Sequence, residues 1–128
     1  MTTDLIRPSD GELAILRVLW DRGPSTVRDV HADLAKGRDI GYTTVLKLLQ
    51  IMVDKGLVTR DESARSHVYQ AAQAEEPTQA CLLRELMDKA FEGSAASLVL
   101  RALSETPADP AELEAIQATL DRLRKERR

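Results

Sequence analysis

Three runs of apolar residues at helical spacing occupy the first half of the chain. The first run extends from Leu13 to Trp20 and follows Ser9 and Glu12, which have the S-x-x-E spacing of a capping box. A capping box pairs two N–H groups that a helix otherwise leaves unpaired at its N-terminus, so it marks a helix start. The pattern therefore predicts a helix over about residues 10–21.

The second and third runs are bounded by similar residues. Thr26 stands three residues before Asp29, which predicts a short helix that ends at the Lys-Gly pair at 36–37. The third run, YTTVLKLLQIMVDK, places apolar residues at i, i+3, i+4, i+7 and i+8 from Val45. Gly56 follows it as a C-terminal capping residue. Three helices are therefore expected before the first β-prone segment.

Two β-prone segments come next, at residues 57–60 and 67–70, and polar or small residues at 61–66 separate them. This spacing predicts a two-stranded hairpin. Three helices followed by a hairpin form a winged helix-turn-helix, in which the third helix enters the major groove of DNA. The hairpin, called the wing, lies along the phosphate backbone.

The second half of the chain is predicted to be helical. The segment AEEPTQ at 74–79 is expected to be a linker, with Pro77 near the start of a helix over about 78–92. A short helix over about 94–104 follows, and the sequence D-P-A-E opens a last helix at Asp109. The apolar residues of this last helix are spaced 3, 4 and 3 apart, as in a coiled-coil seam.

We therefore predict a mainly α fold with a small β-hairpin, composed of a winged helix DNA-binding domain at 1–74 and a helical dimerisation domain at 75–128. A monomer would expose a large apolar surface on the second half, and two copies packed about a twofold axis would cover it. The residues expected at this interface are Leu83, Leu86, Met87, Phe91, Leu98, Val99, Leu113, Ile116, Leu120 and Leu123. Twofold symmetry in turn predicts a palindromic operator.

The polar side of the third helix is the candidate DNA-reading surface. At about 100° per residue, Thr43, Lys47, Gln50 and Asp54 fall opposite Val45, which faces the core. Any solvated helix presents such a polar side, so it is the place of this helix in the motif that favours DNA.

Three of these side chains suit the chemistry of DNA. Thr43 can contact a phosphate or a thymine methyl group, Lys47 can reach guanine or a phosphate, and Gln50 can form paired hydrogen bonds with adenine. Tyr42 and Thr44 flank them near the helix N-terminus, where we expect contacts with the DNA backbone. For Tyr42, packing against the second helix is an equal alternative.

The predicted hairpin carries further candidates for phosphate contacts. Arg65, Ser66 and His67 lie around its tip and second strand, and Arg60 lies on its first strand. We expect these side chains to contact an adjacent phosphate, which adds affinity without much sequence preference.

The net charge of −3 argues against nucleic acid until its distribution is considered. Residues 1–74 carry ten basic and ten acidic side chains, whereas residues 75–128 carry eight and eleven. Residues 36–67 hold six basic against four acidic side chains, a local charge of +2. The basic charge therefore lies in the predicted DNA-binding half, although it is weak.

Other classes of protein find no support in the sequence. Motifs for a nucleophilic serine, a phosphate loop, a zinc protease or a dinucleotide are absent from it, so neither an enzyme nor a cofactor is predicted. Cys81 is the only cysteine, and His31 and His67 are the only histidines, too few ligands for structural zinc. With no apolar run long enough for a bilayer and no signal peptide, we expect a cytosolic protein without membrane insertion.

The chain resembles the BlaI/MecI/CopY group of bacterial repressors, also called penicillinase repressors, over nearly its whole length. The segments that carry the resemblance are SDGELAILRVLW, STVRDVHADL, YTTVLKLLQIMVDKGLV and the hairpin that ends in HVYQA. The resemblance implies an N-terminal winged helix, a C-terminal helical dimerisation region, and repression of operons for β-lactam resistance or metal homeostasis.

In the β-lactam branch of that group, a membrane sensor metalloprotease triggers cleavage of the repressor within its dimerisation region. The resemblance therefore makes such a protease a candidate partner. The cleaved Asn-Phe bond corresponds to the segment SLVLRAL, where this chain has Arg101-Ala102. The cysteine-rich metal motif of the copper branch is absent from this sequence, which argues against direct copper sensing.

Two other functions stay open on the sequence. A winged helix can act as a protein-protein interaction module without touching DNA, and the near-neutral charge of residues 1–74 favours this alternative. A repressor that binds a small-molecule effector between its domains is the other, although one Phe, one Trp and two Tyr offer little aromatic lining.

Overall fold

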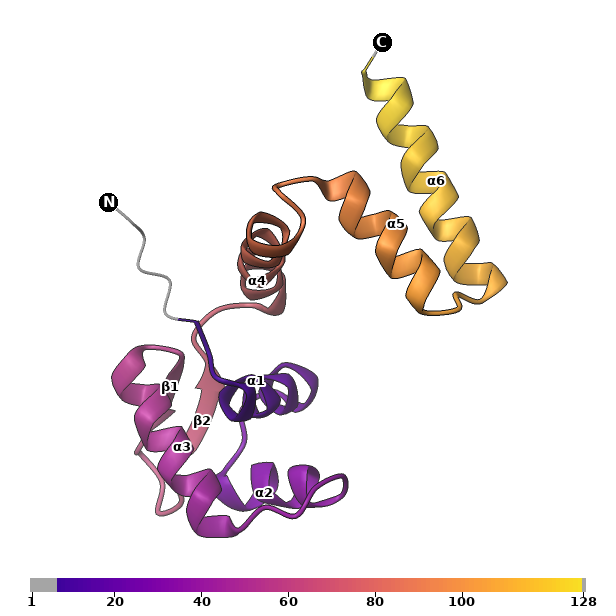
Figure 1. The fold of residues 1–128 in the computed structure, drawn as a ribbon. Helices are drawn as coiled ribbons and strands as arrows, with labels where there is room; N and C mark the ends of the chain where they lie inside the picture. The colour runs from indigo at the N-terminus through magenta and orange to yellow at the C-terminus, as the bar shows by residue number, and fades with distance from the viewer. Residues whose placement is uncertain (1–6, 128) are drawn as a thin grey trace, which may run out of the picture. The chain divides into compact units, whose positions relative to one another are not determined.

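The computed structural model describes residues 7–127, which form helices and one hairpin in the order that the sequence predicts (Figure 1). The elements are α1 (Asp10–Arg22), α2 (Val27–Ala35), α3 (Tyr42–Lys55), β1 (Val58–Asp61), β2 (Val68–Ala71), α4 (Glu75–Ala90), α5 (Ala95–Glu105) and α6 (Pro110–Glu126). The predicted class, mainly α with a small β-hairpin, is confirmed.

Capping boxes start three of these helices. In each box the side-chain oxygen of the N-cap residue accepts from the backbone N–H three residues later, and the carboxylate of that later residue accepts from the N-cap N–H. The three pairs are Ser9 and Glu12, Thr26 and Asp29, and Asp109 and Glu112. Because both groups of each pair are close in sequence, the pattern alone was sufficient to place these helix starts.

A single apolar core joins α1, α2, α3 and the hairpin. Its buried side chains are Ile15, Leu16, Leu19, Val27, Val30, Leu34, Val45, Leu49, Met52, Val58 and Tyr69. The three helices and both strands of the hairpin all contribute to this set. α3 is therefore held by contacts on the side of the helix that faces away from solvent.

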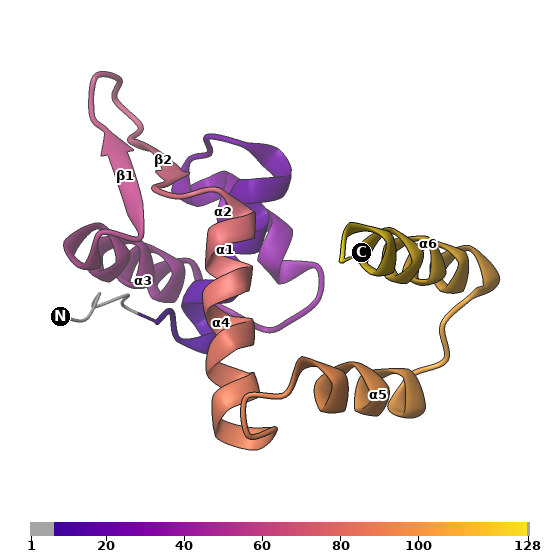
Figure 2. The ribbon, with the colours of Figure 1, turned by 90° about the horizontal axis from the view of Figure 1, so that it is seen from above.

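The second strand of the hairpin is attached to the residue just before the N-cap of α2. Strands β1 and β2 are antiparallel, with Val58 opposite Ala71. Tyr69 on β2 forms a further bridge with Ser25, in which each N–H donates to the other residue's carbonyl, at 2.8 and 2.9 Å. Figure 2 shows the hairpin extending away from the three helices. The wing is therefore anchored at one end and free at its tip.

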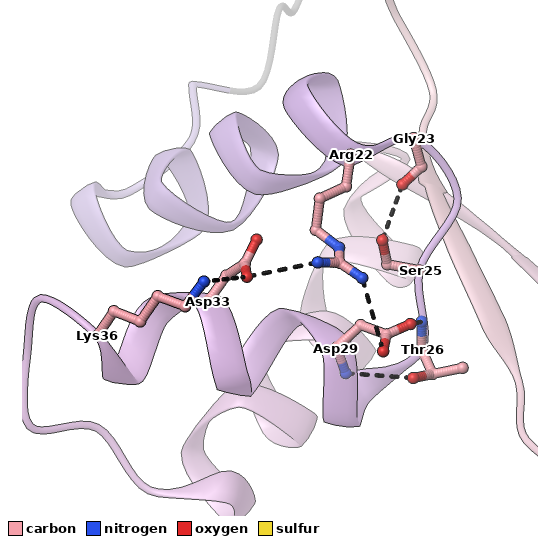
Figure 3. A network of polar contacts seen from close by, with 7 residues as sticks. All are labelled: Arg22, Gly23, Ser25, Thr26, Asp29, Asp33 and Lys36. Carbon is pink, nitrogen blue, oxygen red and sulfur yellow. Dashed lines mark hydrogen bonds and ion pairs between the residues drawn. The ribbon is translucent and has the colours of Figure 1, made fainter.

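A network of polar contacts holds the start of α2 against the end of α1 (Figure 3). The guanidinium of Arg22 lies 3.7 Å from Asp29 and 3.4 Å from Asp33. The Ser25 hydroxyl donates to the carbonyl of Gly23 at 2.9 Å within the connecting turn. These exposed ion pairs contribute little energy each, but they orient the turn that leads into α2.

The segment predicted as a linker is instead helical. α4 begins at Glu75, so nearly all of the stretch 74–79 lies in its first turn and a half. Pro77 is tolerated because the first N–H groups of a helix have no partner within the helix. Glu75 and Glu76 are stabilised there by the positive end of the helix dipole. Acidic residues and proline therefore suit a first helical turn as well as a loop.

The chain divides by compactness into one unit that ends at Leu83 and another that starts at Arg84, a point within α4 and later than the predicted domain boundary. The two regions differ in burial. No residue of α4, α5 or α6 among those that the structure describes is buried. The second unit therefore has no apolar core of its own.

Candidate nucleic-acid interface

The helix α3 presents two opposite sides of different chemistry. Val45, Leu49 and Met52 are fully buried in the core. Thr43, Lys47, Gln50 and Asp54 are all exposed, as the helical geometry predicts. The core therefore holds one side of α3 while leaving a polar surface, defined by these four residues, open to a partner.

The start of α3 lacks a side-chain cap. Its N-cap is Gly41, which offers no side-chain acceptor, and its first turn contains no acidic residue. Tyr42 and Thr44 are exposed in this turn. The unpaired N–H groups and the positive end of the helix dipole favour a negatively charged group here.

Tyr42 meets α2 as well as solvent. Its ring lies 5.8 Å from that of His31 on α2, at an interplanar angle of 74°. The Nε2 atom of His31 lies 2.9 Å from the carbonyl of Ile40, and it must donate there because a carbonyl only accepts. Since 48% of Tyr42 remains exposed, its contact with α2 leaves room for a contact with a ligand.

The end of α3 is tied to the start of α1 by a buried carboxylate. The Lys55 ammonium donates to both carboxylate oxygens of Glu12, at 3.0 Å each, and only 2% of Glu12 is exposed. The two helices are also close at Gly11, where an added Cβ would lie 3.3 Å from Leu48. Both contacts restrict how α3 can move relative to α1.

Burial by itself raises the pKa of Glu12, because it removes the charged form from water. The backbone N–H of Ser9 donates to the Glu12 carboxylate at 2.9 Å, and Lys55 adds a hydrogen bond and its positive charge. Together these interactions outweigh burial and hold the pKa of Glu12 below its ordinary value. Glu12 is therefore charged when the protein is folded at neutral pH, and it both caps α1 and holds α3.

The wing residues fall into two groups. Arg65, Ser66 and His67 are exposed around the tip. Arg60 is half-buried, and its Nε donates to Glu62 at 2.7 Å. Hydrogen bonding with Tyr69, and then with Glu62, raises the pKa of Arg60 above its ordinary value. The charge of Arg60 is thus partly engaged within the wing, whereas Arg65 is more open to solvent.

A groove of about 470 Å³ lies between α2, α3 and the wing. Its lining residues are Thr26, Val27, Arg28, Tyr42, Leu46, Arg65, Ser66, His67 and Tyr69. The groove therefore brings together four of the predicted site residues, Tyr42, Arg65, Ser66 and His67. Thr43, Thr44, Lys47, Gln50 and Arg60 do not line it.

Five residues that line this groove were not predicted as site residues, and two of them, at the start of α2, are polar and at least partly open to solvent. Thr26 and Arg28 belong to the start of α2, which the sequence identified only as a helix cap. Arg28 adds a second arginine to Arg65, with His67 also in the lining, and none of the described residues that line the groove is acidic. The one sequence signal for Arg28 is its position in the first turn of a helix, where the positive end of the helix dipole makes a basic side chain unfavourable.

The residues predicted for dimerisation lie on the surface of the chain. Six of them are exposed: Leu83, Leu86, Val99, Leu113, Leu120 and Leu123. The other four are half-buried: Met87, Phe91, Leu98 and Ile116. The structure adds Leu100 and Leu103, which are also exposed, and Leu100 is open to 66%.

The described residues contain no group of three or more histidine, cysteine, aspartate or glutamate side chains that could hold a metal ion. None of the helices in this described part of the chain is long and apolar enough to cross a membrane.

Comparison with known proteins gives a consistent result. A family model described as penicillinase repressor matches residues 8–122. The chain is 34% identical over 110 residues to the protein named transcriptional regulator BlaI in two strains of Mycobacterium tuberculosis, CDC 1551 / Oshkosh and ATCC 25618 / H37Rv. Each match covers 84% of this chain and 80% of the relative.

Proposed function

This chain belongs to the penicillinase repressor family and is therefore a transcriptional repressor rather than an enzyme, and from this premise we propose that it recognises a palindromic DNA operator as a homodimer. α3 enters the major groove of each half-site, and the wing contacts the phosphate backbone beside it.

The observation that carries this proposal is the exposed polar side of α3 on a helix whose other side is fully buried. α3 has 14 residues, which corresponds to about 21 Å of helix, and the major groove is about 12 Å wide and accepts an α-helix. Lys47 suits guanine, Gln50 suits adenine, and Thr43 suits a phosphate or a thymine methyl group. Because the core fixes α3, these side chains are held in register for base contacts.

The groove between α2, α3 and the wing supports a path for one DNA strand. It places Arg28 and Arg65 on two different elements that border α3, with His67 beside them. When α3 lies in the major groove of DNA, the phosphates of each strand run along the edge of the major groove. Side chains such as Arg28 and Arg65 can neutralise those phosphates. Tyr42, Thr44 and Ser66 add hydrogen-bond donors, and Arg60 contributes where its bond to Glu62 can be exchanged for a phosphate.

The apolar surface of α4, α5 and α6 supports a second copy of this chain as its partner. None of the described residues of these helices is buried, although each helix carries large apolar side chains. A soluble monomer rarely leaves so many apolar side chains exposed together. Two weakly charged DNA-binding modules joined in this way gain affinity that one module lacks, with half-sites one or more turns of about 34 Å apart.

We place the regulated genes in β-lactam resistance or a related stress response, a role that rests on the family alone. Such a role makes a membrane sensor metalloprotease a partner of the repressor. In this chain, however, Arg101 and Ala102 replace the Asn-Phe bond expected for cleavage, and Arg101 pairs with Glu105 at 3.6 Å within α5. Incubating the repressor with a sensor metalloprotease of the β-lactam branch would show whether and where it is cut.

Binding to promoter DNA over a series of salt concentrations tests the proposal. An operator complex weakens steeply as salt rises, because phosphate contacts release bound counterions. Lys47→Ala should weaken binding and Gln50→Ala should relax base preference, each by about 1–3 kcal/mol. Arg17→Ala, which removes an exposed charge from α1, is the matched control and should leave binding unchanged. Wild-type affinity and selectivity in both α3 variants would show that α3 does not recognise the operator.

A second candidate, a winged helix that binds another protein, is favoured by the balanced charge of residues 1–74, with ten basic and ten acidic side chains. A protein interface of moderate polarity depends weakly on salt, so the same experiment separates the two functions. If the wild-type chain fails to bind promoter DNA even at low salt, the interaction module is the better explanation.

A further inference from the structure

Two large apolar side chains are exposed between residues 7 and 74, and both lie on α3: Tyr42, at 48%, and Ile51, at 38%. The exposure of Tyr42 has a local explanation, since its ring contacts His31 and lines the groove. Ile51 lies outside that groove. Its neighbours Leu46, Leu48 and Val53 pack against the core. Ile51 is thus an apolar group on the solvent side of α3, whereas the other apolar residues of this helix, apart from Tyr42, are buried or half-buried.

Ile51 lies beside the polar surface of α3. On a helix with about 3.6 residues per turn, it is one turn beyond Lys47 and offset from it by about 40°. Thr44, Lys47 and Ile51 form a row at i, i+3 and i+7 that runs alongside the row of Thr43, Lys47, Gln50 and Asp54. The two rows share Lys47. A duplex that lies along the polar surface of α3 therefore passes beside Ile51.

We propose that Ile51 contacts the C5-methyl group of a thymine in each half-site and so contributes to base specificity. The thymine methyl is the one apolar group that the four bases present in the major groove. Contact with Ile51 removes both groups from water, which is favourable without any hydrogen bond. The inference rests on the proposed function, because it requires α3 to lie in the major groove.

The test compares thymine with uracil, which lacks only this methyl group. The full-length protein is used to select a duplex from a randomised pool, and each thymine of the selected duplex is then replaced by uracil in turn. At one thymine position per half-site, the replacement should weaken binding by wild-type protein about three- to fivefold, the factor expected for burial of one methyl group. At thymines that α3 does not contact it should have little effect.

Variants at the same position assign the effect to Ile51. Ile51→Ala should bind the thymine and uracil duplexes equally at that position, and Ile51→Val should keep the preference for thymine. Lys47→Ala should weaken binding to both duplexes by the same factor and keep the ratio between them. Because Ile51 is partly exposed, Ile51→Ala should keep most of the wild-type stability, and its unfolding temperature, measured alongside, separates misfolding from the loss of one contact.

Two results would overturn the inference, and they can be told apart. In the first, a duplex is selected, but either Ile51→Ala keeps the wild-type preference for thymine or the wild-type protein shows no such preference at any position. Ile51 then does not contact a methyl group, and the proposed function stands. If the wild-type protein selects no duplex, the proposed function fails together with the inference, and the exposed apolar residues of α3 point to a protein partner instead.

Discussion

α3 and α6 both carry apolar residues along one side, but the two helices differ in what covers that side. Val45, Leu49 and Met52 of α3 are fully buried by α1, α2 and the hairpin. In α6, by contrast, Leu113 and Leu120 are exposed, and none of the described residues is buried. Amphipathic spacing therefore specifies a helix in both places. Elements of the same chain bury the apolar side of α3, whereas the apolar side of α6 stays exposed.

The largest expected effect is in the core. Leu49→Ala should lower the free energy of unfolding of the N-terminal unit by about 2–5 kcal/mol, because it removes buried methyl groups and leaves a cavity. Chemical denaturation at several protein concentrations measures this, and the loss should be the same at each concentration. A loss below about 1 kcal/mol would mean that this side of α3 is packed less tightly than its burial indicates.

The corresponding change in α6 should act on association instead. Leu113→Asp combined with Leu120→Asp should weaken the dimer by about 2–4 kcal/mol, because each copy would place two charges in an apolar interface. Analytical ultracentrifugation measures the dissociation constant. Ala118→Asp adds a charge to the opposite side of α6 and is the matched control, which should dimerise as wild type does. Equal dissociation constants for all three proteins would remove α6 from the dimer interface.

An intermediate effect is expected where Glu12 joins α1 and α3. Glu12→Gln should lower the free energy of unfolding by about 1–3 kcal/mol at neutral pH, since the buried contact with Lys55 loses its charge. Folding lowers the pKa of Glu12, so the unfolded chain takes up this proton first as the pH falls. The stabilisation is complete above the pKa of the unfolded chain and is lost as the pH falls through the pKa of the folded one.

Urea denaturation between neutral and acidic pH measures this dependence. Folding also lowers the pKa values of Asp29 and Asp61, through hydrogen bonds from Thr26 and Ser63, so wild-type stability should decline in acid for more than one reason. The difference between wild type and Glu12→Gln isolates the part due to Glu12, and it should shrink as the pH falls. A difference that stays constant with pH would show that the charge of Glu12 contributes nothing.

The smallest effect is expected at the helix N-caps, where α2 and α6 start with the same kind of capping box. Thr26→Ala should lower the unfolding free energy of the N-terminal unit by about 1 kcal/mol, and Thr26→Ser should restore most of it. Asp109→Ala removes the equivalent cap from α6 and should leave that unfolding transition unchanged, because α6 takes no part in the core of the N-terminal unit. An equal loss in both variants would mean that the two regions unfold as one.

The sequence was sufficient to predict features that depend on neighbours along the chain. The capping boxes, the buried and exposed sides of α3 and the glycine at its end all follow from spacing, and Gly56 does adopt the left-handed conformation, with φ of 81°. The start of α4 was predicted too late, because Glu75, Glu76 and Pro77 are common both in linkers and in first helical turns.

Features that join distant parts of the chain could not be predicted in this way. Glu12 and Lys55 are 43 residues apart, and no local pattern indicates that they pair. The groove needs α2 and the wing side by side, which depends on the bridge between Ser25 and Tyr69. Arg28 therefore joined the candidate site only once the fold was known. Helical spacing alone puts Ile51 beside the polar side of α3, but its exposure was established only by the structure.

The uncovered sides of α4, α5 and α6 have a consequence for gene dosage. With a second copy of the chain as the missing partner, protein at concentrations well below the dimer dissociation constant is mostly monomeric, and in that range the number of operator-binding pairs rises with the square of the protomer concentration. Halving expression would then leave about a quarter of the pairs. A cell could relieve repression sharply by making less of this protein, without any ligand that changes its shape.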